Sequence, residues 1–289
     1  MEIIRSIAEM QQIALKCKQK GKKVGFVPTM GFLHEGHERL MEEAKKENDV
    51  VVTSIFVNPL QFGPNEDFDR YPRDEVHDIK ISEDKKVDFL FLPEHDDMYP
   101  SNQSVTMQVV NRTNVLCGRT RDGHFAGVVT VLTKLFHIIL PDNVYFGLKD
   151  AQQVAVVDSL VNDFNFPLKV VPVSTVREKD GLAKSSRNVY LSNQERENAP
   201  YIYQGLQFGQ KKVIDGEKNP AIIVKEVENY IVDHTHGKID YVELLSYPEL
   251  TPIDKVDQQV ILAVAVQFDR ARLIDNLVFD QNGKISGKI

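Results

Sequence analysis

The sequence predicts an α/β protein, with a Rossmann-like, doubly wound parallel sheet followed by a smaller C-terminal α+β domain. Strand-like apolar segments alternate with helical segments as far as about residue 176, which is typical of a parallel sheet between helices. Helical segments followed by strand-like segments occupy the rest, which is typical of a small α+β domain. A chain of 289 residues is long enough for about two domains. We therefore expect domains over residues 1–176 and 177–289, with the boundary in the polar stretch REKDGLAKSSRN.

Each expected element of the first domain has its own signal. Residues 2–19, 35–47 and 125–140 carry apolar residues at helical spacing. Residues 50–57 form a continuous β-branched run, as expected of a strand that is covered on both sides. The expected strands are 23–28, 50–57, 87–92, 144–147 and 168–176, and the expected helices are 2–19, 35–47, 125–140 and 152–162.

The second domain is expected to begin with helices near 193–214 and 219–234. Strand-like runs follow at 239–245, 260–266 and 272–279. Strands that follow one another without an intervening helix are expected to pair antiparallel.

Charge and composition exclude several classes of protein. The chain has 35 Lys and Arg against 42 Asp and Glu, a net charge of −7, which argues against a nucleic-acid-binding surface but allows a local cationic pocket. Cys17 and Cys117 are too few for a disulfide framework or a zinc module, and a reducing compartment is expected. The N-terminus lacks a signal-peptide pattern, and no apolar run reaches the ~20 residues that span a bilayer. We therefore expect a cytoplasmic protein with no membrane partner.

The segment Pro28–His37, PTMGFLHEGH, follows the expected strand at 23–28 and opens a helix. Open α/β sheets bind ligands at the carboxyl ends of their strands, and a helix N-terminus suits phosphate. His34 and His37 lie one helical turn apart, so both can face one phosphate and stabilise a leaving pyrophosphate. Gly36 leaves room for phosphate or ribose to approach the backbone. Two other interpretations stay open: a surface histidine pair that caps the helix, and a metal-binding pair, for which no third ligand is evident.

The segment FGLKDAQQ also lies between a strand and a helix. Gly147 can let a nucleotide lie on the backbone, Lys149 offers a positive charge, and Asp150 can accept from ribose hydroxyls or cap the helix. Gln152 and Gln153 point about 100° apart on a helix, so at most one is expected to face the site.

Two basic segments carry further donors. Lys184–Asn188, KSSRN, combines a lysine, two hydroxyls and an arginine that suit phosphate oxygens, although a solvated basic loop is the alternative. Arg121 and His124 precede the helix expected at 125–140. They can clamp a carboxylate or phosphate, and a loop-stabilising hydrogen bond from His124 is the alternative.

The loop after the expected strand at 50–57 is rich in amides and carboxylates. The amides of Asn58 and Gln61 both donate and accept, which suits a small substrate with hydroxyls and a carboxylate. The acidic residues Glu66, Asp67 and Asp69 are expected to lie in a solvated loop.

The chain resembles the pantothenate synthetase family, the pantoate–β-alanine ligases, in six segments that run in order over essentially the whole chain: PTMGFLHEGH, FVNPLQFGPNEDFDRYPR, GHFAGVVTVLTKLF, FGLKDAQQ, DGLAKSSRN and ARLIDN. The resemblance implies a homodimer of the HIGH/KMSKS nucleotidyltransferase superfamily, with a nucleotide- and pantoate-binding domain and a C-terminal lid domain. It implies that pantoate attacks the α-phosphorus of ATP, assisted by Mg²⁺, to give pantoyl adenylate and pyrophosphate. The amine of β-alanine then displaces AMP.

The resemblance also assigns roles to residues of this sequence. His34 and His37 match ATP-contacting histidines, with His37 as the proton donor, and Gln61 and Gln153 match the glutamines that hold pantoate. Further matches to nucleotide-binding positions are Met30, Gly31, Gly147, Leu148, Lys149, Asp150, Val176, Lys184, Ser185, Ser186 and Arg187. Matches to lesser positions around pantoate and β-alanine are Asn58, Tyr71, Arg121 and His124. The residues expected to stabilise charge during adenylation are His34, His37, Lys149, Ser185 and Arg187. No protein ligand is implied for Mg²⁺, which is expected to be held mainly by the ATP phosphates.

Two residues depart from the family pattern. Leu148 stands where Glu is common, and Lys184 stands where Leu or Met is common. Neither change removes a residue assigned to chemistry, so we expect activity to remain. The competing interpretations are a related enzyme that transfers adenylate to a phosphate and a catalytically silent RNA-binding module. The amide-rich NPLQF segment disfavours the first, and the negative charge disfavours the second.

Overall fold

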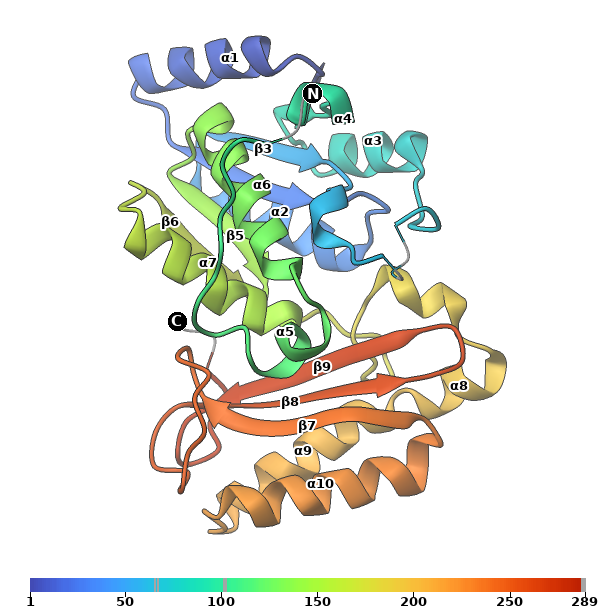
Figure 1. Cartoon of the computed structure of the whole chain (residues 1–289). Helices are drawn as coiled ribbons and strands as arrows, with labels where there is room; N and C mark the ends of the chain where they lie inside the picture. The colour runs from blue at the N-terminus through green and yellow to red at the C-terminus, as the bar shows by residue number, and fades with distance from the viewer. Residues whose placement is uncertain (65, 67, 101–102, 287–289) are drawn as a thin grey trace. The chain divides into compact units, whose positions relative to one another are not determined.

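The computed structural model describes residues 1–64, 66, 68–100 and 103–286, which form two compact units (Figure 1). The first unit comprises Met1–Val110, Arg121–Gly147 and Val156–Val173. The second comprises Asn111–Thr120, Leu148–Ala155 and Ser174–Ile289, so it takes in two segments that precede residue 176. The functional division at residue 176 stays a prediction.

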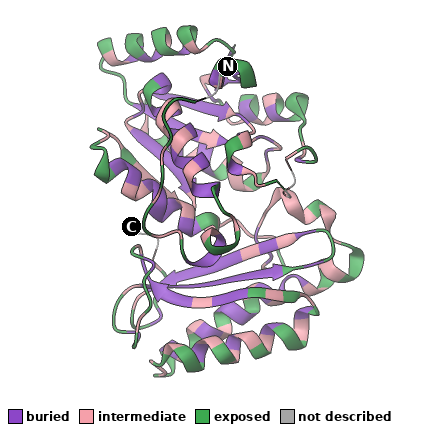
Figure 2. Cartoon of the chain, viewed as in Figure 1, coloured by how far each residue is buried: buried purple, intermediate pink, exposed green. Residues whose placement is uncertain are grey.

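A six-stranded parallel sheet forms the centre of the first unit, in the order β1-β4-β3-β2-β5-β6. Its strands are β1 (Glu2–Ile4), β2 (Val24–Thr29), β3 (Val50–Ile55), β4 (Phe89–Phe91), β5 (Asn143–Gly147) and β6 (Lys169–Val173). The central strands are buried along nearly their whole length (Figure 2), which explains their continuous apolar runs. The predicted parallel α/β sheet is confirmed.

Helices cover both faces of this sheet. Right-handed crossovers place α2 (Glu35–Glu47) and α3 (Glu75–Asp84) on one face, because the chain moves from β2 through β3 to β4 in one direction. The chain moves in the opposite direction through α1 (Ile7–Gln19), α6 (His124–Ile139) and α7 (Ala151–Asp163), which therefore lie on the other face. Figure 1 shows α2 and α6 on opposite sides of the sheet.

The strand order reverses between β2 and β5, which pair in parallel at the centre of the sheet. Doubly wound sheets bind ligands outside the carboxyl ends of the strands at such a reversal. The carboxyl ends here are Thr29 and Gly147, each followed by a segment that the sequence singles out. The topology therefore puts the starts of PTMGFLHEGH and FGLKDAQQ at the expected ligand position.

The N-terminal helix begins later than predicted. Residues 2–4 form β1, which pairs with β4, and Ile4 is buried there. Ser6 caps α1 by accepting from the backbone N–H of Glu9 at 3.4 Å. The S-x-x-E pattern of residues 6–9 marks this start, so the predicted helix over residues 2–19 is wrong for its first turn.

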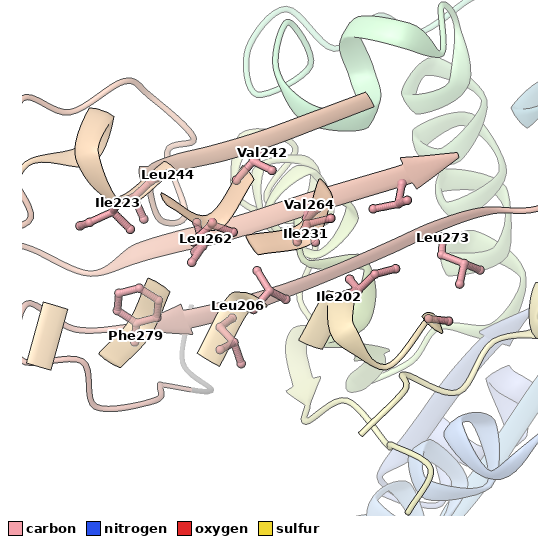
Figure 3. Close-up of a cluster of buried hydrophobic side chains, with 14 of the residues drawn as sticks. Ile202, Leu206, Ile223, Ile231, Val242, Leu244, Leu262, Val264, Leu273 and Phe279 are labelled. Carbon is pink, nitrogen blue, oxygen red and sulfur yellow. The ribbon is translucent and has the colours of Figure 1, made fainter. Parts of the chain in front are cut away.

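The second unit contains an antiparallel sheet in the order β7-β8-β9, as predicted. Its strands are β7 (Lys238–Ser246), β8 (Val260–Gln267) and β9 (Arg272–Phe279), and its long helices are α9 (Tyr201–Ile214) and α10 (Pro220–Thr235). Side chains of both helices and all three strands form one apolar core (Figure 3). The single helix predicted near 193–214 is wrong, because α8 (Asn193–Asn198) ends before Pro200, which begins a new helix as the cap of α9.

Short elements complete the described chain. They are α4 (His95–Met98), α5 (Leu116–Thr120) and the 3₁₀ helices η1 (Pro59–Gln61), η2 (Leu148–Asp150) and η3 (Ser186–Tyr190). The sequence did not predict α3, because the residues that it buries are the polar Asp78 and Ser82 rather than an apolar stripe. In the described ranges, no helix is long and apolar enough to cross a membrane.

Candidate active site

The two histidines of PTMGFLHEGH cap the N-terminus of α2. His34 is the N-cap residue, and its Nδ1 accepts from the N–H of Gly36 at 3.1 Å. The Nδ1 of His37 accepts from the N–H of His34 at 3.3 Å, and the two rings lie 4.1 Å apart between centroids. A Cβ on residue 36 would lie 2.7 Å from the His34 ring, so glycine lets the ring fold over the helix start. The pair therefore caps the helix, as one interpretation of the sequence predicted, but both residues are half-buried rather than on the surface.

A buried carboxylate holds the loop between β2 and α2. Asp78, on the first turn of α3, is 1% exposed, and its two oxygens accept from the N–H groups of Phe32 at 2.9 Å and Leu33 at 2.7 Å. Gly31 and Phe32 both have positive φ, so the chain turns sharply here and its N–H groups need partners from outside the loop. Burial raises the pKa of Asp78, and the two N–H donors oppose that rise. His77 adds a ring contact of 3.1 Å from Nε2 to the Leu33 carbonyl.

The amide of Asn58 is used entirely within the first unit. Its Nδ2 donates to Gln61 Oε1 at 2.9 Å and to the Gly127 carbonyl at 3.0 Å. Its Oδ1 accepts from the Leu60 N–H at 3.3 Å and from the Tyr99 hydroxyl at 2.9 Å. Asn58 is fully buried, and burial also raises the pKa of the Tyr99 hydroxyl. These bonds fix the Gln61 side chain and orient its carboxamide, with Oε1 turned toward Asn58.

Arg121 and His124 fix the main chain of Gln61. His124 Nδ1 lies 2.8 Å from the Gln61 carbonyl, and Arg121 donates to the same oxygen at 3.3 Å. Arg121 also binds both oxygens of Glu66, at 2.8 and 2.6 Å. The expectation of a solvated acidic loop is therefore wrong for Glu66, while Asp69 is exposed and Asp67 lies outside the described residues. Burial alone would raise the pKa of Glu66, but the hydrogen bonds and charge of Arg121 outweigh it and lower that pKa.

In the second unit, η2 carries Lys149 and Asp150, whose side chains lie 3.4 Å apart. The next helix turns Gln152 inward, where its Nε2 donates to the carbonyls of Arg112 and Val115 at 2.9 and 2.8 Å. Gln153 is half-buried. This arrangement is consistent with the expectation that the two glutamines point in different directions. Gln152 binds the backbone of the segment before α5.

The KSSRN segment follows a short hairpin. The Val176 carbonyl accepts from the Lys184 N–H at 2.9 Å, and the Glu178 N–H donates to the Leu182 carbonyl at 2.8 Å. Ser185 caps η3 by accepting from the Arg187 N–H at 3.3 Å. All four residues from Lys184 to Arg187 are half-buried, so the segment is less exposed to solvent than a solvated basic loop would be.

Comparison with known proteins identifies the family. The model of the family described as pantoate-β-alanine ligase matches residues 2–278. The chain belongs to this family. As the six segments predicted, it is an acid–amine ligase that joins pantoate to β-alanine.

Curated relatives agree over nearly the full length. A pantothenate synthetase from Geobacillus thermodenitrificans is 59% identical over 280 residues, 97% of this chain and 97% of its own. One from Bacillus cytotoxicus is 56% identical over 277 residues, 96% of this chain and 98% of its own.

Solved structures share the fold. The pantothenate synthetase from Thermus thermophilus has a TM-score of 0.90 at 42% identity, covering 96% of this chain and 99% of its own. The pantoate-β-alanine ligase from Francisella tularensis, complexed with β-γ ATP and β-alanine, has a TM-score of 0.79 at 36% identity, covering 97% of this chain and 98% of its own.

Asp78 and Gln152 are the polar residues that sequence reasoning missed or left without a role. The sequence carried no usable signal for Asp78, because the helix α3 that presents it was itself not predicted. Among the described residues, no group of three or more His, Cys, Asp or Glu side chains is placed to hold a metal ion.

The Glu66–Arg121 pair predicts a pH-dependent contribution to stability. The folded pKa of Glu66 lies below its ordinary value of 4.5, so the pair stabilises the fold above that pH and is lost as pH falls through the folded pKa. We expect Glu66→Gln to lower the free energy of unfolding by about 1–3 kcal/mol at neutral pH and by progressively less in acid. Urea unfolding of both proteins between pH 7 and ~3 measures this difference.

Asp69→Asn is the matched control, because Asp69 lies in the same loop but is exposed. It should change stability little at any pH. A Glu66→Gln effect that stays constant from neutral to acid pH would contradict the assignment.

Proposed function

We propose that the chain uses ATP to activate pantoate as pantoyl adenylate, which β-alanine then attacks to give pantothenate, AMP and pyrophosphate. A carboxylate resists attack by an amine because oxide is a poor leaving group, and adenylation replaces oxide with AMP. The observation that carries this proposal is the histidine pair at the N-terminus of α2, at the switch point of a doubly wound sheet.

The capping hydrogen bonds define what the histidines can do. Because Nδ1 of each ring accepts a backbone N–H, a neutral His34 or His37 carries its proton on Nε2. Each Nε2–H is then a donor suited to phosphate oxygens. We assign to His37 the donation that stabilises charge on the departing pyrophosphate, with His34 beside it.

The remaining nucleotide contacts are assigned to main-chain and cationic groups. Lys149, Ser185 and Arg187 would stabilise the charge that gathers during adenylation. The hydroxyl oxygen of Ser185 accepts from the backbone N–H of Arg187, so the hydroxyl hydrogen can be donated to a phosphate oxygen. The other proposed nucleotide-binding positions are Met30, Gly31, Gly147, Leu148, Asp150, Val176, Lys184 and Ser186.

Pantoate is assigned to Gln61 and Gln153. Asn58 has all four hydrogen-bonding positions occupied within the protein, so we propose that it acts through Gln61 rather than on the substrate. Arg121 and His124 bind the Gln61 main chain and would act in the same indirect way. Tyr71 keeps its proposed place near the substrates.

Magnesium, a homodimeric state and a cytoplasmic location are further parts of the proposal. Mg²⁺ would neutralise charge on the triphosphate, and the ATP oxygens are its proposed ligands because no acidic metal cluster occurs in the described chain. Two cysteines, both free, suit a reducing compartment. Residues 177–289 are proposed to act as the lid domain, and residues 1–176 as the nucleotide- and pantoate-binding domain.

The decisive test is exchange of labelled pyrophosphate into ATP that requires pantoate and Mg²⁺ but no β-alanine. We expect exchange, because the adenylate forms before the amine reacts. Adding β-alanine should then release AMP and pantothenate in equal amounts. Release of AMP and pantothenate without any exchange would contradict a freely reversible adenylate step in the absence of amine.

Replacing His37 should affect chemistry more than folding. We expect His37→Ala to lower turnover by ~10²-fold or more, as loss of a preorganised charge stabiliser does. Steady-state kinetics with a thermal melt on the same sample separates the two effects. Near-normal turnover in a folded His37→Ala protein would refute the role assigned to this residue.

Asp78 should influence ATP binding through the loop that it holds. Asp78→Asn keeps the shape but turns one acceptor into a donor that faces a backbone N–H. We expect the KM for ATP to rise about tenfold, the equivalent of one lost hydrogen bond, while the KM for pantoate changes little. Asp74→Asn is the control, because Asn also caps the same helix through the His77 N–H. Equal KM values for ATP in the two variants would count against this role.

A further inference from the structure

The motif ARLIDN has no role in the function described so far. Its last two residues, Asp275 and Asn276, lie in the middle of β9, flanked by apolar residues of the core such as Leu273 and Leu277. Both polar side chains are buried, at 4% and 8% exposure. A carboxylate and an amide are costly to bury without hydrogen bonds, so their partners indicate what they are for.

Asn276 holds the segment that carries Lys149. Its Nδ2 donates to the carbonyl oxygens of Leu148 and Lys149, both at 2.9 Å. Both hydrogens of the amide are therefore used on two successive carbonyls of η2. This arrangement fixes the backbone at the point from which the Lys149 side chain extends.

Asp275 holds the hairpin that leads into the KSSRN segment. Its Oδ2 accepts from Arg177 Nη1 at 2.6 Å and its Oδ1 from Nη2 at 2.9 Å, a two-point contact. The same guanidinium lies 3.6 Å from the centre of the Tyr203 ring and donates to the Gly181 carbonyl at 3.1 Å. Arg177 is thus held on several sides, at the base of hairpin 176–184.

The two anchors belong to one small unit of structure. Successive residues of a strand point to opposite faces, so Asp275 and Asn276 reach different segments from the same place. Asp275 Oδ1 also accepts from the N–H of Asn276 at 2.8 Å. A displacement of β9 at this point would move both segments together.

We propose that Asp275 and Asn276 are positioning residues that set the Lys149 segment against the Lys184–Arg187 loop, so that both bind the phosphates of one ATP molecule. The proposal rests on the nucleotide-binding role proposed above for these two segments. A contribution to folding alone is the alternative. Stability alone is a weak reason to keep such a pair, because well-packed apolar residues of similar volume often replace a buried ion pair without loss of stability.

The test compares Asn276→Ala and Asp275→Asn with a matched control, Ser246→Ala. Ser246 is buried in β7 of the same sheet, and its hydroxyl bonds to Thr251, away from both segments. Calorimetric titration with ATP and Mg²⁺, without pantoate, gives the Kd, and thermal unfolding gives the stability. We expect Asn276→Ala and Asp275→Asn to raise the Kd for ATP about tenfold. Ser246→Ala also removes buried hydrogen bonding from this sheet, so it should lower the melting temperature about as much as Asn276→Ala does, but it should leave the Kd within about twofold of the unmodified protein.

Hydrogen–deuterium exchange on the same proteins provides a second readout. Asn276→Ala should speed exchange in peptides covering residues 148–155, and Asp275→Asn in peptides covering residues 176–184. Arg177→Lys keeps the charge but loses the two-point contact, so it should give an intermediate Kd. If Asp275→Asn does not fold, Asn276→Ala decides the matter, because it leaves no buried charge unpaired.

The outcomes separate this proposal from the proposed function. Unchanged Kd values in folded Asn276→Ala and Asp275→Asn proteins would overturn the positioning role, even if pantoate-dependent exchange is normal. A raised Kd for ATP in both variants, together with no pantoate-dependent exchange in the unmodified protein, would support the positioning role and overturn the proposed reaction. If the Kd rises in proportion to the fall in melting temperature in all variants, Ser246→Ala included, the role of the two residues is structural only and the positioning role is overturned.

Discussion

The loops and short 3₁₀ turns that carry the candidate site residues leave backbone groups without partners in a longer helix or a sheet, and those groups must be satisfied where they are buried. A few buried polar side chains supply the missing partners. Asp78 binds two N–H groups before α2, Gln152 binds two carbonyls of the segment before α5, and Asn276 binds two carbonyls of η2. Each side chain uses both of its donors or acceptors on neighbouring backbone groups, so each fixes the direction of a loop as well as its position.

The same constraint explains why groups that look suited to a ligand can have another task. Asn58 carries the donors and acceptors that a hydroxy acid needs, yet the protein uses all four. His34 and His37 both cap a helix through Nδ1, and this use of one nitrogen decides which nitrogen can donate. Capping and the proposed phosphate-binding role are therefore compatible for the histidines, because the cap leaves the proton of a neutral ring on Nε2.

Much of the fold could be predicted because strong local signals agree with the global arrangement. The continuous run of β3 and the amphipathic pattern of α2 predicted the right elements at nearly the right ends. The sequence did not reveal β1, whose three residues are stabilised by pairing with β4, far along the chain. It did not reveal α3 either, because the inner face of that helix is occupied by a carboxylate with a task in another loop. The histidine segment was predictable because strand, turn and helix follow one another in sequence. The Glu66–Arg121 pair was not, because its partners are 55 residues apart.

The polar pair of β9 shows how the partners of a buried polar side chain indicate its task. In an antiparallel strand that packs on helices, one face should be apolar, and Leu273, Leu277 and Phe279 follow that rule. Asp275 falls on the same face by alternation, so a charge occupies a core position, and Arg177 is what makes it tolerable there. Such a break in the pattern has to be compensated by a specific partner, and the partner identifies the segment being held. Here Asp275 and Asn276, one on each face of the strand, bind the hairpin before Lys184–Arg187 and the segment that carries Lys149. On the positioning role proposed above, β9 would govern where these two segments present their positive charge.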